Sequence, residues 1–374
     1  MKFVVPRMVF SLVLICAGFD ISLAQSTCSA PDLVCAAKTS VYRVVGPAGD
    51  ASAVRIGSEL LITNRQVIGG QTKISIRTAN GQAVTGTVLP SGLWEDLILV
   101  RAILPEGEPI HIGATISEQI YTIGFDRTLT DIVVHPAGKM VSRPVPALKT
   151  SRIHHTSHRR SGTSGSALVN QSGELIGISL MGHGKYFSAI SGESVEILKS
   201  SSGQQFLQAH RNIGKAYTTC MKALEFGREV RRQLSSSFLS DLERACVGTR
   251  NSQFIARAAK LFQRMGQFSN TKKLLNLAAT YDPDAIAIRL DLISSHVFRR
   301  EFEEAQPYVA KLLSLIPESE DLQSYALQVG RFTKNEELIQ TTLDIIKKHN
   351  PQLYDAAQNF LKSDLKPVMR GSFN

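Results

Sequence analysis

The hydrophobic pattern of the chain changes once, near residue 200, and this change limits the folds available to it. Before that point, short runs rich in β-branched side chains alternate with turn residues, which is typical of strands. After it, apolar residues recur every three or four positions, the spacing of an amphipathic helix. The sequence therefore predicts an all-β domain over residues 25–200, a linker over 201–212 and an all-α domain over 213–374.

Eight runs in the first part carry the strand pattern. Strands this short and closely spaced favour an all-β barrel or sandwich. The runs are 41–45, 60–62, 73–77, 97–102, 120–123, 132–135, 167–170 and 175–180. Between the last two, residues 170–173 read Asn-Gln-Ser-Gly, which predicts a hairpin turn.

The N-terminus has the pattern of a secretory signal peptide. Lys2 and Arg7 precede an apolar stretch over residues 8–19, and residues 22–24, Ser-Leu-Ala, form a small-residue cleavage site. We expect cleavage before Gln25 and an exported protein, either periplasmic or secreted. The alternative is an uncleaved anchor, but the stretch is shorter than the roughly 20 residues that span a bilayer, and no later segment qualifies.

Four cysteines follow the expected cleavage site, an even number that suits disulfides in an oxidising compartment. They are Cys28, Cys35, Cys220 and Cys246. Of the three possible pairings, we favour Cys28–Cys35 and Cys220–Cys246, because each pair lies within one local segment and the second would join neighbouring helices. A zinc site is the alternative, but no cysteine has Cys-x-x-Cys spacing.

The charge balance is basic, since 42 Lys and Arg against 32 Asp and Glu give a formal charge of +10. The cations are spread over both halves of the chain, which favours contact with anionic surfaces such as envelope polymers, lipid headgroups or acidic polypeptides. No nucleic-acid motif accompanies them, so we expect no nucleic-acid partner. No motif implies a cofactor.

Three segments of the first part carry polar residues that chemistry could use. Residues 61–68 read Leu-Ile-Thr-Asn-Arg-Gln-Val-Ile, residues 95–100 read Glu-Asp-Leu-Ile-Leu-Val, and residues 162–167 read Gly-Thr-Ser-Gly-Ser-Ala. Their order and spacing resemble the trypsin-like serine proteases, in particular the bacterial high-temperature-requirement (Htr) and glutamyl endopeptidase branches. The resemblance implies a double β-barrel, with residues 186–190 as the closing strand of the second barrel.

In that family a serine hydroxyl attacks the substrate, a histidine takes its proton and an aspartate orients the histidine. The resemblance makes Ser164 the nucleophile, Asp96 the orienting carboxylate, and the N–H groups of Gly162 and Ser164 the oxyanion hole. Gln66 occupies the histidine position, and its amide takes no proton near neutral pH. Loss of one triad member lowers kcat by roughly 10⁴–10⁶, so we expect a pseudoprotease, a protease fold without useful activity.

Three histidines before the serine turn, His154, His155 and His158, could supply a substitute base. In the family this stretch walls the primary specificity pocket, so we expect these side chains to face the substrate rather than the nucleophile. His158 and Arg159 would make that pocket positive and favour an acidic side chain or a C-terminal carboxylate. A solvated basic loop remains an alternative, as does a three-histidine metal site, which the spacing does not favour, and we expect no metal.

The helical part contains an internal repeat. Pro283, Pro317 and Pro351 recur at equal intervals, and each ends an amphipathic run. A helical period of about 34 residues with a terminal proline resembles the tetratricopeptide repeat, TPR. The resemblance implies stacked helix pairs with a concave groove that suits an extended peptide or a partner helix. An irregular helical bundle is the alternative.

These features together predict an exported trypsin-like pseudoprotease that binds a peptide in its cleft and recruits a protein partner through a TPR-like array. The alternative is an active serine endopeptidase, which would use Ser164 with a non-standard base and the helical array as a docking module. Gln66 favours the first function, whereas the intact turn around Ser164 supports the second.

Overall fold

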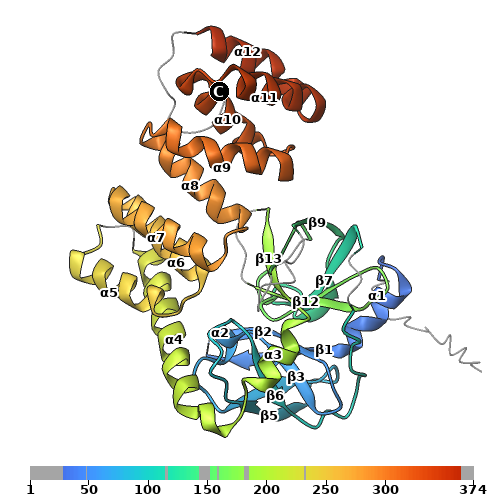
Figure 1. Cartoon of the computed structure of the whole chain (residues 1–374). Helices are drawn as coiled ribbons and strands as arrows, with labels where there is room; N and C mark the ends of the chain where they lie inside the picture. The colour runs from blue at the N-terminus through green and yellow to red at the C-terminus, as the bar shows by residue number, and fades with distance from the viewer. Residues whose placement is uncertain are drawn as a thin grey trace, which may run out of the picture.

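The computed structural model describes residues 28–47, 49–113, 117–142, 152–157, 160–180, 185–230 and 233–363. The expected signal peptide, residues 1–24, lies outside these residues, as do Gln25, His158 and Arg159. Strands fill the first part of the chain, and the helices of the second part rise beside them in one continuous stack (Figure 1). The prediction of an all-β part followed by an all-α part is confirmed.

Six antiparallel strands close the first barrel, in the order β1-β2-β3-β6-β5-β4 with β4 returning to β1. The strands are β1 (Val41–Gly46), β2 (Gly49–Arg55), β3 (Leu60–Thr63), β4 (Lys73–Arg77), β5 (Ala83–Leu89) and β6 (Ile98–Arg101). Successive side chains of a strand point to opposite faces, so alternate residues fill the barrel. Val44, Leu61, Ile76, Val88 and Val100 form its core and are at most 1% exposed.

The second barrel is a ring of six strands, β11-β12-β13-β10-β9-β7, closed by the pairing of β7 with β11, and β8 extends it beside β7. The strands are β7 (Gln119–Asp126), β8 (Asp131–Val134), β9 (Gly138–Ser142), β10 (Arg152–His155), β11 (Ala167–Val169), β12 (Leu175–Ser179) and β13 (Phe187–Ser191). A shared apolar cluster, with Ile62 and Leu99 from one barrel and Ile123 and Ala167 from the other, holds the two together.

Each predicted strand run overlaps an observed strand, including the closing strand at 186–190. The hairpin turn is also present, with the N–H of Gly173 donating to the carbonyl of Asn170 at 3.1 Å. Strands β2, β5, β9 and β10 carry no clear signal in the sequence because Gly, Ala, Ser or His interrupts their β-branched residues. Ladder hydrogen bonds to neighbouring strands hold them extended, which local preference alone would not do.

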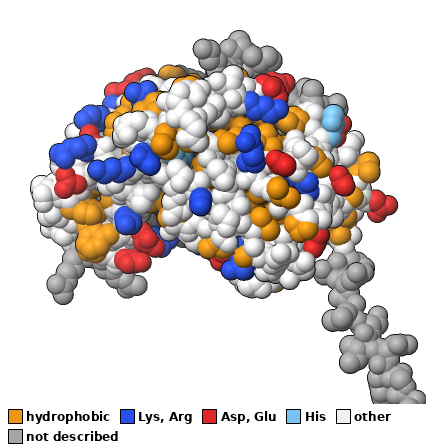
Figure 2. Space-filling view, turned by 90° about the horizontal axis from the view of Figure 1, so that it is seen from below, with side chains coloured by type: hydrophobic (Ala, Val, Ile, Leu, Met, Phe, Trp, Pro, Cys, Tyr) orange, Lys and Arg blue, Asp and Glu red, His pale blue; other side chains and the backbone are white. Residues whose placement is uncertain are grey.

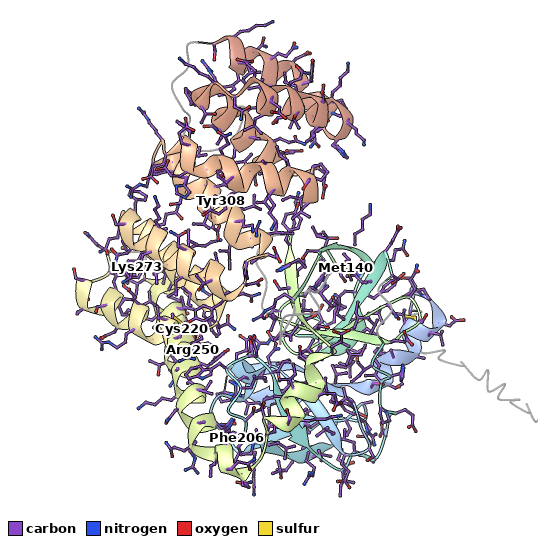
Figure 3. The ribbon with its side chains drawn as sticks, in the orientation of Figure 1. Met140, Phe206, Cys220, Arg250, Lys273 and Tyr308 are labelled. Carbon is purple, nitrogen blue, oxygen red and sulfur yellow. A yellow bond between two sulfur atoms is a disulfide. The ribbon has the colours of Figure 1, made fainter. Side chains whose placement is uncertain are left out.

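The connection between the two parts differs from the linker expected over 201–212. Helix α3 (Ser194–Ser200) and the short 3₁₀ helix η2 (Gln204–Phe206) lead directly into α4 (Leu207–Glu229). Polar residues fill the first turns of α4, so the apolar period shows only from Ile213. Phe206 fixes this start on the first barrel, where a Cβ on Gly92 would lie 2.8 Å from its ring (Figure 3).

Three helix pairs follow α4 and α5 (Ser236–Val247), and α12 (Tyr354–Lys362) packs on the last of them. The pairs are α6 (Ser252–Arg264) with α7 (Phe268–Tyr281), α8 (Ile286–Phe298) with α9 (Phe302–Leu315), and α10 (Glu320–Thr333) with α11 (Glu336–His349). Corresponding helices of successive pairs begin at equal intervals along the chain, the same interval that separates the three prolines. We call this stack, from α4 to α12, the helical array.

Packing inside the array follows the same interval. Phe268 packs on Phe298 with ring centroids 5.0 Å apart, and Phe302 packs on Phe332 at 4.8 Å. The corner between the two helices of each pair has a residue with positive φ. These residues are Gly266 (φ 71°), Arg300 (62°) and Lys334 (56°). The backbone therefore repeats in its turns as well as in its helix lengths.

Both favoured disulfides are present. Cys28–Cys35 ties the start of the described chain to α1 (Asp32–Ala36), and Cys220–Cys246 joins α4 to α5. Among the described residues, no helix combines the length and apolar character needed to cross a membrane. On the face shown in Figure 2, Lys and Arg side chains alternate with acidic and apolar ones rather than forming one continuous patch.

The helical array contacts both barrels. α4 lies on α2 (Arg65–Ile68) of the first barrel, so closely that a Cβ on Gly214 would be 2.3 Å from the backbone of Gly69. The guanidinium of Arg250 lies 4.3 Å over the ring of Trp94 (Figure 3 places Arg250 near Cys220). The corner after α7 reaches the second barrel through Asp282. The array therefore packs against both barrels, including the segment that contains Gln66.

Candidate active site

Gln66 lies in the single turn of α2, directly after strand β3. Its main-chain N–H donates to Oδ1 of Asp96 at 2.8 Å, and the side-chain amide of Asn64 donates to the Asp96 carbonyl at 3.0 Å. These bonds place the Asp96 carboxylate against the start of α2. The structure therefore brings two of the three predicted triad positions together.

The Gln66 side chain is 3% exposed, and its Nε2 atom has no hydrogen-bond partner among the described residues. The amide therefore does not join Asp96 to Ser164 in the way that an imidazole would. Oδ1 of the nearby Asn64 is likewise buried and without a described partner. Two buried polar atoms next to the carboxylate are thus left without the bonds that such atoms normally make.

Asp96 is 2% exposed, and this burial raises the pKa of its carboxyl to about 7. The hydrogen bond from the Gln66 N–H and the charges of Arg152 and Arg65 lower this pKa, but by less than burial raises it. A buried carboxylate is costly unless donors satisfy it, and no described imidazole donates here. The group therefore titrates close to neutral pH.

Two arginines hold the segment that carries Asp96. Arg65 is 0% exposed; it donates to the carbonyl of Leu93 at 2.7 Å and lies 3.2 Å from Nδ1 of His210 on α4. Arg152 of β10 pairs with Glu95 at 2.7 Å and so links the second barrel to the same segment. Both barrels and the array thus converge on the residues around Asp96.

Ser164 lies in a tight turn before β11. The turn uses Gly162 at φ 103° and Gly165 at φ 80°, values that L side chains rarely adopt. A Cβ on Gly165 would lie 2.2 Å from the Ser52 carbonyl and 2.4 Å from Oγ1 of Thr63. The serine turn is therefore pressed against the end of β3, three residues before Gln66.

Ser52 of β2 joins the serine turn to the first barrel. Its N–H donates to the Ser164 carbonyl at 2.9 Å, and its hydroxyl donates to the Gly162 carbonyl at 3.1 Å. The same hydroxyl accepts from the N–H of Phe125 at 2.8 Å. Sequence reasoning missed Ser52, because it is an ordinary residue of a strand that carries no motif.

The Ser164 side chain is partly exposed, and no described residue forms a hydrogen bond with its hydroxyl. The N–H groups of Gly162 and Ser164 also donate to no acceptor among the described residues. Fixed N–H groups of this kind can hold a carbonyl oxygen that carries developing charge. Both N–H groups are thus candidates for binding a carbonyl oxygen.

His154 and His155 follow each other on β10, so their side chains point to opposite faces. His154 faces the array, with Nδ1 3.2 Å from the Ser188 hydroxyl and Nε2 3.3 Å from Oδ1 of Asp282. The His155 ring lies 5.9 Å from that of Phe187. Both are buried strand residues rather than parts of a solvated loop, and neither forms a described hydrogen bond with Ser164.

His158 and Arg159, the expected lining of a positive specificity pocket, lie outside the described residues. Their neighbour Arg160 pairs with Asp126 at 3.4 Å. Within the described ranges, no three His, Cys, Asp or Glu side chains are arranged to hold a metal ion.

Comparison with known proteins agrees with this geometry. The profile of the trypsin-like peptidase domain family matches residues 51–178, from β2 into β12. A protein of Staphylococcus haemolyticus described as serine protease HtrA-like is 25% identical over 137 residues, and the match covers 32% of this chain and 21% of that protein. The chain thus spans about a fifth of the length of this curated relative.

Two solved structures are also similar. The serine endoprotease from Yersinia pestis is 21% identical and superposes with a TM-score of 0.40 over 48% of this chain and 67% of its own. A protease from M. tuberculosis in its active form is 14% identical, with a TM-score of 0.38 over 54% of this chain and 94% of its own.

The two closed barrels, the serine turn and the matched family profile define a trypsin-like serine protease fold. The matched segment ends at residue 178, so the helical array lies beyond it.

Proposed function

We propose that this chain is an exported pseudoprotease, in which the trypsin-like cleft binds a polypeptide without cutting it and the helical array recruits a protein partner. Gln66 carries the proposal. Its N–H donates to the Asp96 carboxylate at 2.8 Å, so the residue at the histidine position lies beside the carboxylate. Ser164 stands at the nucleophile position, Gln66 at the degenerate histidine position, and Asp96 is the carboxylate that would orient a histidine.

Acyl transfer by Ser164 requires a group that takes the hydroxyl proton. The Gln66 amide cannot do so. The Asp96 carboxylate accepts from the Gln66 backbone N–H, and His154 is engaged by Ser188 and Asp282. None of these groups offers the base that cleavage needs.

Peptide binding does not depend on that base. The fixed turn from Gly162 to Gly165, the two uncommitted N–H groups and the partly exposed Ser164 suit the carbonyl of an extended segment. We assign the side-chain pocket beside them to His158 and Arg159, whose charges would favour an acidic side chain or a C-terminal carboxylate.

The array supports the second half of the proposal. Three helix pairs that recur at equal intervals are typical of TPR proteins, whose concave face binds extended peptides or helices. We place the boundary between the two parts within residues 201–212. Two disulfides favour an oxidising compartment, consistent with cleavage before Gln25 and a periplasmic or secreted destination.

The intact serine turn favours a second candidate function. In this alternative the chain is an active serine endopeptidase that uses Ser164 with a non-standard base, and the array is its docking module. His155 and His158 are the histidines of the turn region that this alternative would have to use, because His154 faces the array.

The experiment that separates the two uses purified protein starting at Gln25, incubated with unfolded casein and with a serine-directed phosphonate probe. Ser164→Ala and Gln66→His are compared in parallel. We expect no cleavage and no labelling of the native protein, and Ser164-dependent cleavage after Gln66→His. Cleavage by the native protein, with labelling lost in Ser164→Ala, would favour the endopeptidase.

A further inference from the structure

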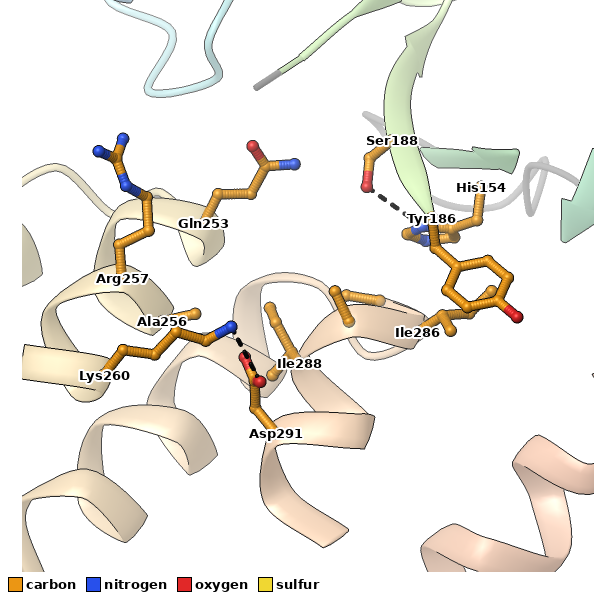
Figure 4. A pocket seen from close by; sticks show the side chains of 12 residues that line it. His154, Tyr186, Ser188, Gln253, Ala256, Arg257, Lys260, Ile286, Ile288 and Asp291 are labelled. Carbon is orange, nitrogen blue, oxygen red and sulfur yellow. Dashed lines mark hydrogen bonds and ion pairs between the residues drawn. The ribbon is translucent and has the colours of Figure 1, made fainter. Parts of the chain in front are cut away.

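Two buried imidazoles lie where the helical array meets the barrels. His154 belongs to β10 of the second barrel, and His210 belongs to α4, which packs on the first. His154 lies between the Ser188 hydroxyl and the Asp282 carboxylate, and Figure 4 shows its bond to Ser188. His210 instead lies 3.2 Å from the guanidinium of Arg65. An anion thus faces the first ring, whereas a cation faces the second.

The contacts of His210 fix its protonation state. Its Nδ1 atom lies 3.2 Å from a guanidinium nitrogen of Arg65, and its Nε2 atom lies 3.0 Å from the carbonyl oxygen of Gln71. A guanidinium only donates and a carbonyl only accepts, so Nδ1 accepts and Nε2 carries the proton. The folded structure therefore requires the neutral ring. We call Arg65, His210 and the Gln71 carbonyl the α2–α4 contact.

A second proton on the ring would disrupt this contact. It would be placed on Nδ1 and would point at the Arg65 guanidinium, with both side chains 0% exposed. Like charges at a buried site are screened much less than charges at the surface. The hydrogen bond from Arg65 to Nδ1 would also be lost, because a protonated nitrogen cannot accept.

The other charged groups that act on His210 do not balance such a proton. Burial, and the charges of Arg65 and Arg211, lower the pKa of His210, whereas the hydrogen bond to Gln71 raises it. Arg211 is the next residue of α4 and is exposed. Both side-chain charges that act on the ring are therefore cations.

The acidic groups near Arg65 give little compensation in acid. Tyr217 and Asp96 are the two that act on its guanidinium. Burial raises the pKa of both, that of Asp96 to about 7, so the Tyr217 hydroxyl stays neutral and Asp96 loses its charge as the pH falls below 7. Glu95 pairs with Arg152 at 2.7 Å. Acid would therefore remove the negative charge of Asp96 while it added a positive charge to the α2–α4 contact.

We propose that His210 makes the docking of the array on the first barrel sensitive to acid: the neutral ring holds α4 on α2, and protonation releases it. The disulfide Cys220–Cys246 keeps α4 joined to α5. The pair of His154 with Asp282 keeps the array on the second barrel, since a second proton on that ring would lie beside a carboxylate. In acid the array thus separates from the first barrel and stays attached to the second.

The release would extend to the candidate site. Arg65 directly precedes Gln66 in α2. Its guanidinium also donates to the carbonyl of Leu93 at 2.7 Å and so holds the segment that leads to Asp96. Loss of the His210 contact would remove one of the partners that fix this guanidinium. The release itself does not require a catalytically active cleft.

Trp94, the only tryptophan of the chain, reports on this docking. It packs against the apolar cluster of the array that contains Tyr217 of α4, and the Arg250 guanidinium lies 4.3 Å over its ring. The test follows Trp94 emission from about pH 8 to about pH 4.5 in purified protein starting at Gln25, with circular dichroism to follow helix content. The range ends above the pH at which Asp282, whose pKa is lowered, would be protonated.

We expect the emission to move to longer wavelength below about pH 6.5, the usual pKa of imidazole, because the ring becomes exposed to water. Helix content should stay constant, since α4 remains part of the array. The ratio of released to docked molecules should rise by about ten-fold per pH unit, as expected for one proton.

His210→Gln is the decisive variant, because its amide can accept from Arg65 and donate to Gln71 but gains no charge in acid. We expect it to abolish the transition. His111→Gln is the matched control, since it removes an imidazole whose side chain is 80% exposed, and it should leave the transition unchanged. A native protein without a transition above about pH 4.5, or an unchanged transition in His210→Gln, would overturn the proposal.

Hydrogen exchange of the native protein tests the same release without a substitution. Amide exchange, corrected for its intrinsic pH dependence, is compared at about pH 7 and about pH 5. We expect protection to fall by about ten-fold or more in α2 and in the first turns of α4, and to be retained in β10 and β13. Equal protection of α2 at both pH values would refute the release.

Discussion

Oδ1 of Asp282 lies 3.3 Å from Nε2 of His154, and both side chains are 2% exposed. The pair joins the corner after α7 to strand β10, at the junction of the array with the second barrel. Burial alone would raise the pKa of Asp282, but the contact with His154, and then the charges of Arg152 and Arg289, lower it below the usual value. The folded protein therefore holds this carboxylate ionised.

We expect His154→Ala to destabilise the protein by about 3–5 kcal/mol at pH 7, because it leaves the Asp282 carboxylate buried without its partner. The free energy of unfolding in guanidinium chloride measures the effect. The control is Lys311→Ala, which breaks a half-exposed pair with Asp284 and should cost about 0–1 kcal/mol. The lowered pKa of Asp282 adds stability above about pH 4 that is lost as the pH falls through that pKa. A loss of less than about 1 kcal/mol for His154→Ala would refute this account.

Asp96 should affect the pH dependence of stability in the opposite way to Asp282, because its pKa is raised rather than lowered. Its pKa is raised to about 7 in the folded protein, so the folded state binds the proton more tightly than the unfolded state. The resulting stability is fully present below the unfolded pKa and is lost as the pH rises through about 7. We expect Asp96→Asn to be more stable than the native protein at pH 8 by roughly 2–4 kcal/mol and to differ little at pH 4. Parallel pH profiles of the two proteins, measured by chemical unfolding, would contradict the assignment.

The serine turn should tolerate no side chain at position 165. Gly165 and Gly81 have almost the same φ, 80° and 82°, but a Cβ on Gly165 meets the Ser52 carbonyl at 2.2 Å, whereas nothing lies within 4 Å of one on Gly81. We expect Gly81→Ala to cost about 1 kcal/mol from backbone strain alone. Gly165→Ala should cost at least about 2 kcal/mol more, since the turn must move away from β2. Melting temperatures of the two variants decide the point, and equal values would disprove it.

The corners of the array offer a stabilising change. Lys334 and Arg300 adopt positive φ at exposed positions where the first pair has Gly266. We expect Lys334→Gly and Arg300→Gly each to stabilise the array by about 0.5–1 kcal/mol, because glycine adopts this conformation without strain. Gly266→Ala is the matched reverse change and should destabilise by a similar amount. A fall in melting temperature in both glycine variants would show that these side chains contribute more than the strain costs.

The sequence predicted the barrels where local pattern and tertiary structure agree. The run at 97–102 is apolar except for Arg101, because both faces of β6 are buried from Ile98 to Val100, and it was therefore readable as a strand. β10 was not, since Arg152, Ile153, His154 and His155 have no strand pattern and are held extended by β9 and β13. The array was recognisable from its prolines, yet the start of α4 was hidden by polar residues.

In the candidate site, the resemblance to the trypsin-like proteases implied that Gln66 stands beside Asp96, and the structure brings the two together. The sequence could not reveal Ser52, which lies 110 residues from Gly162 in the chain and whose hydroxyl donates to it. Arg65 was equally hidden. An arginine is expected at the surface, and its partners are carbonyls of a distant loop and His210, 145 residues later. Long-range contacts of this kind leave no local pattern.

The close contact of Gly214 with Gly69 has a consequence for the order in which the chain assembles. Domains generally fold from the N-terminus during synthesis, and the last barrel strand ends at Ser191, before α4 has been made. Until α4 is made, the backbone of Gly69 lacks its contact with Gly214, and the guanidinium of Arg65 lacks its contact with His210. The barrel surface around Gly69 and Arg65 is thus uncovered in the newly made barrels. It becomes covered when α4, the first helix of the array, packs on it with Gly214 against Gly69.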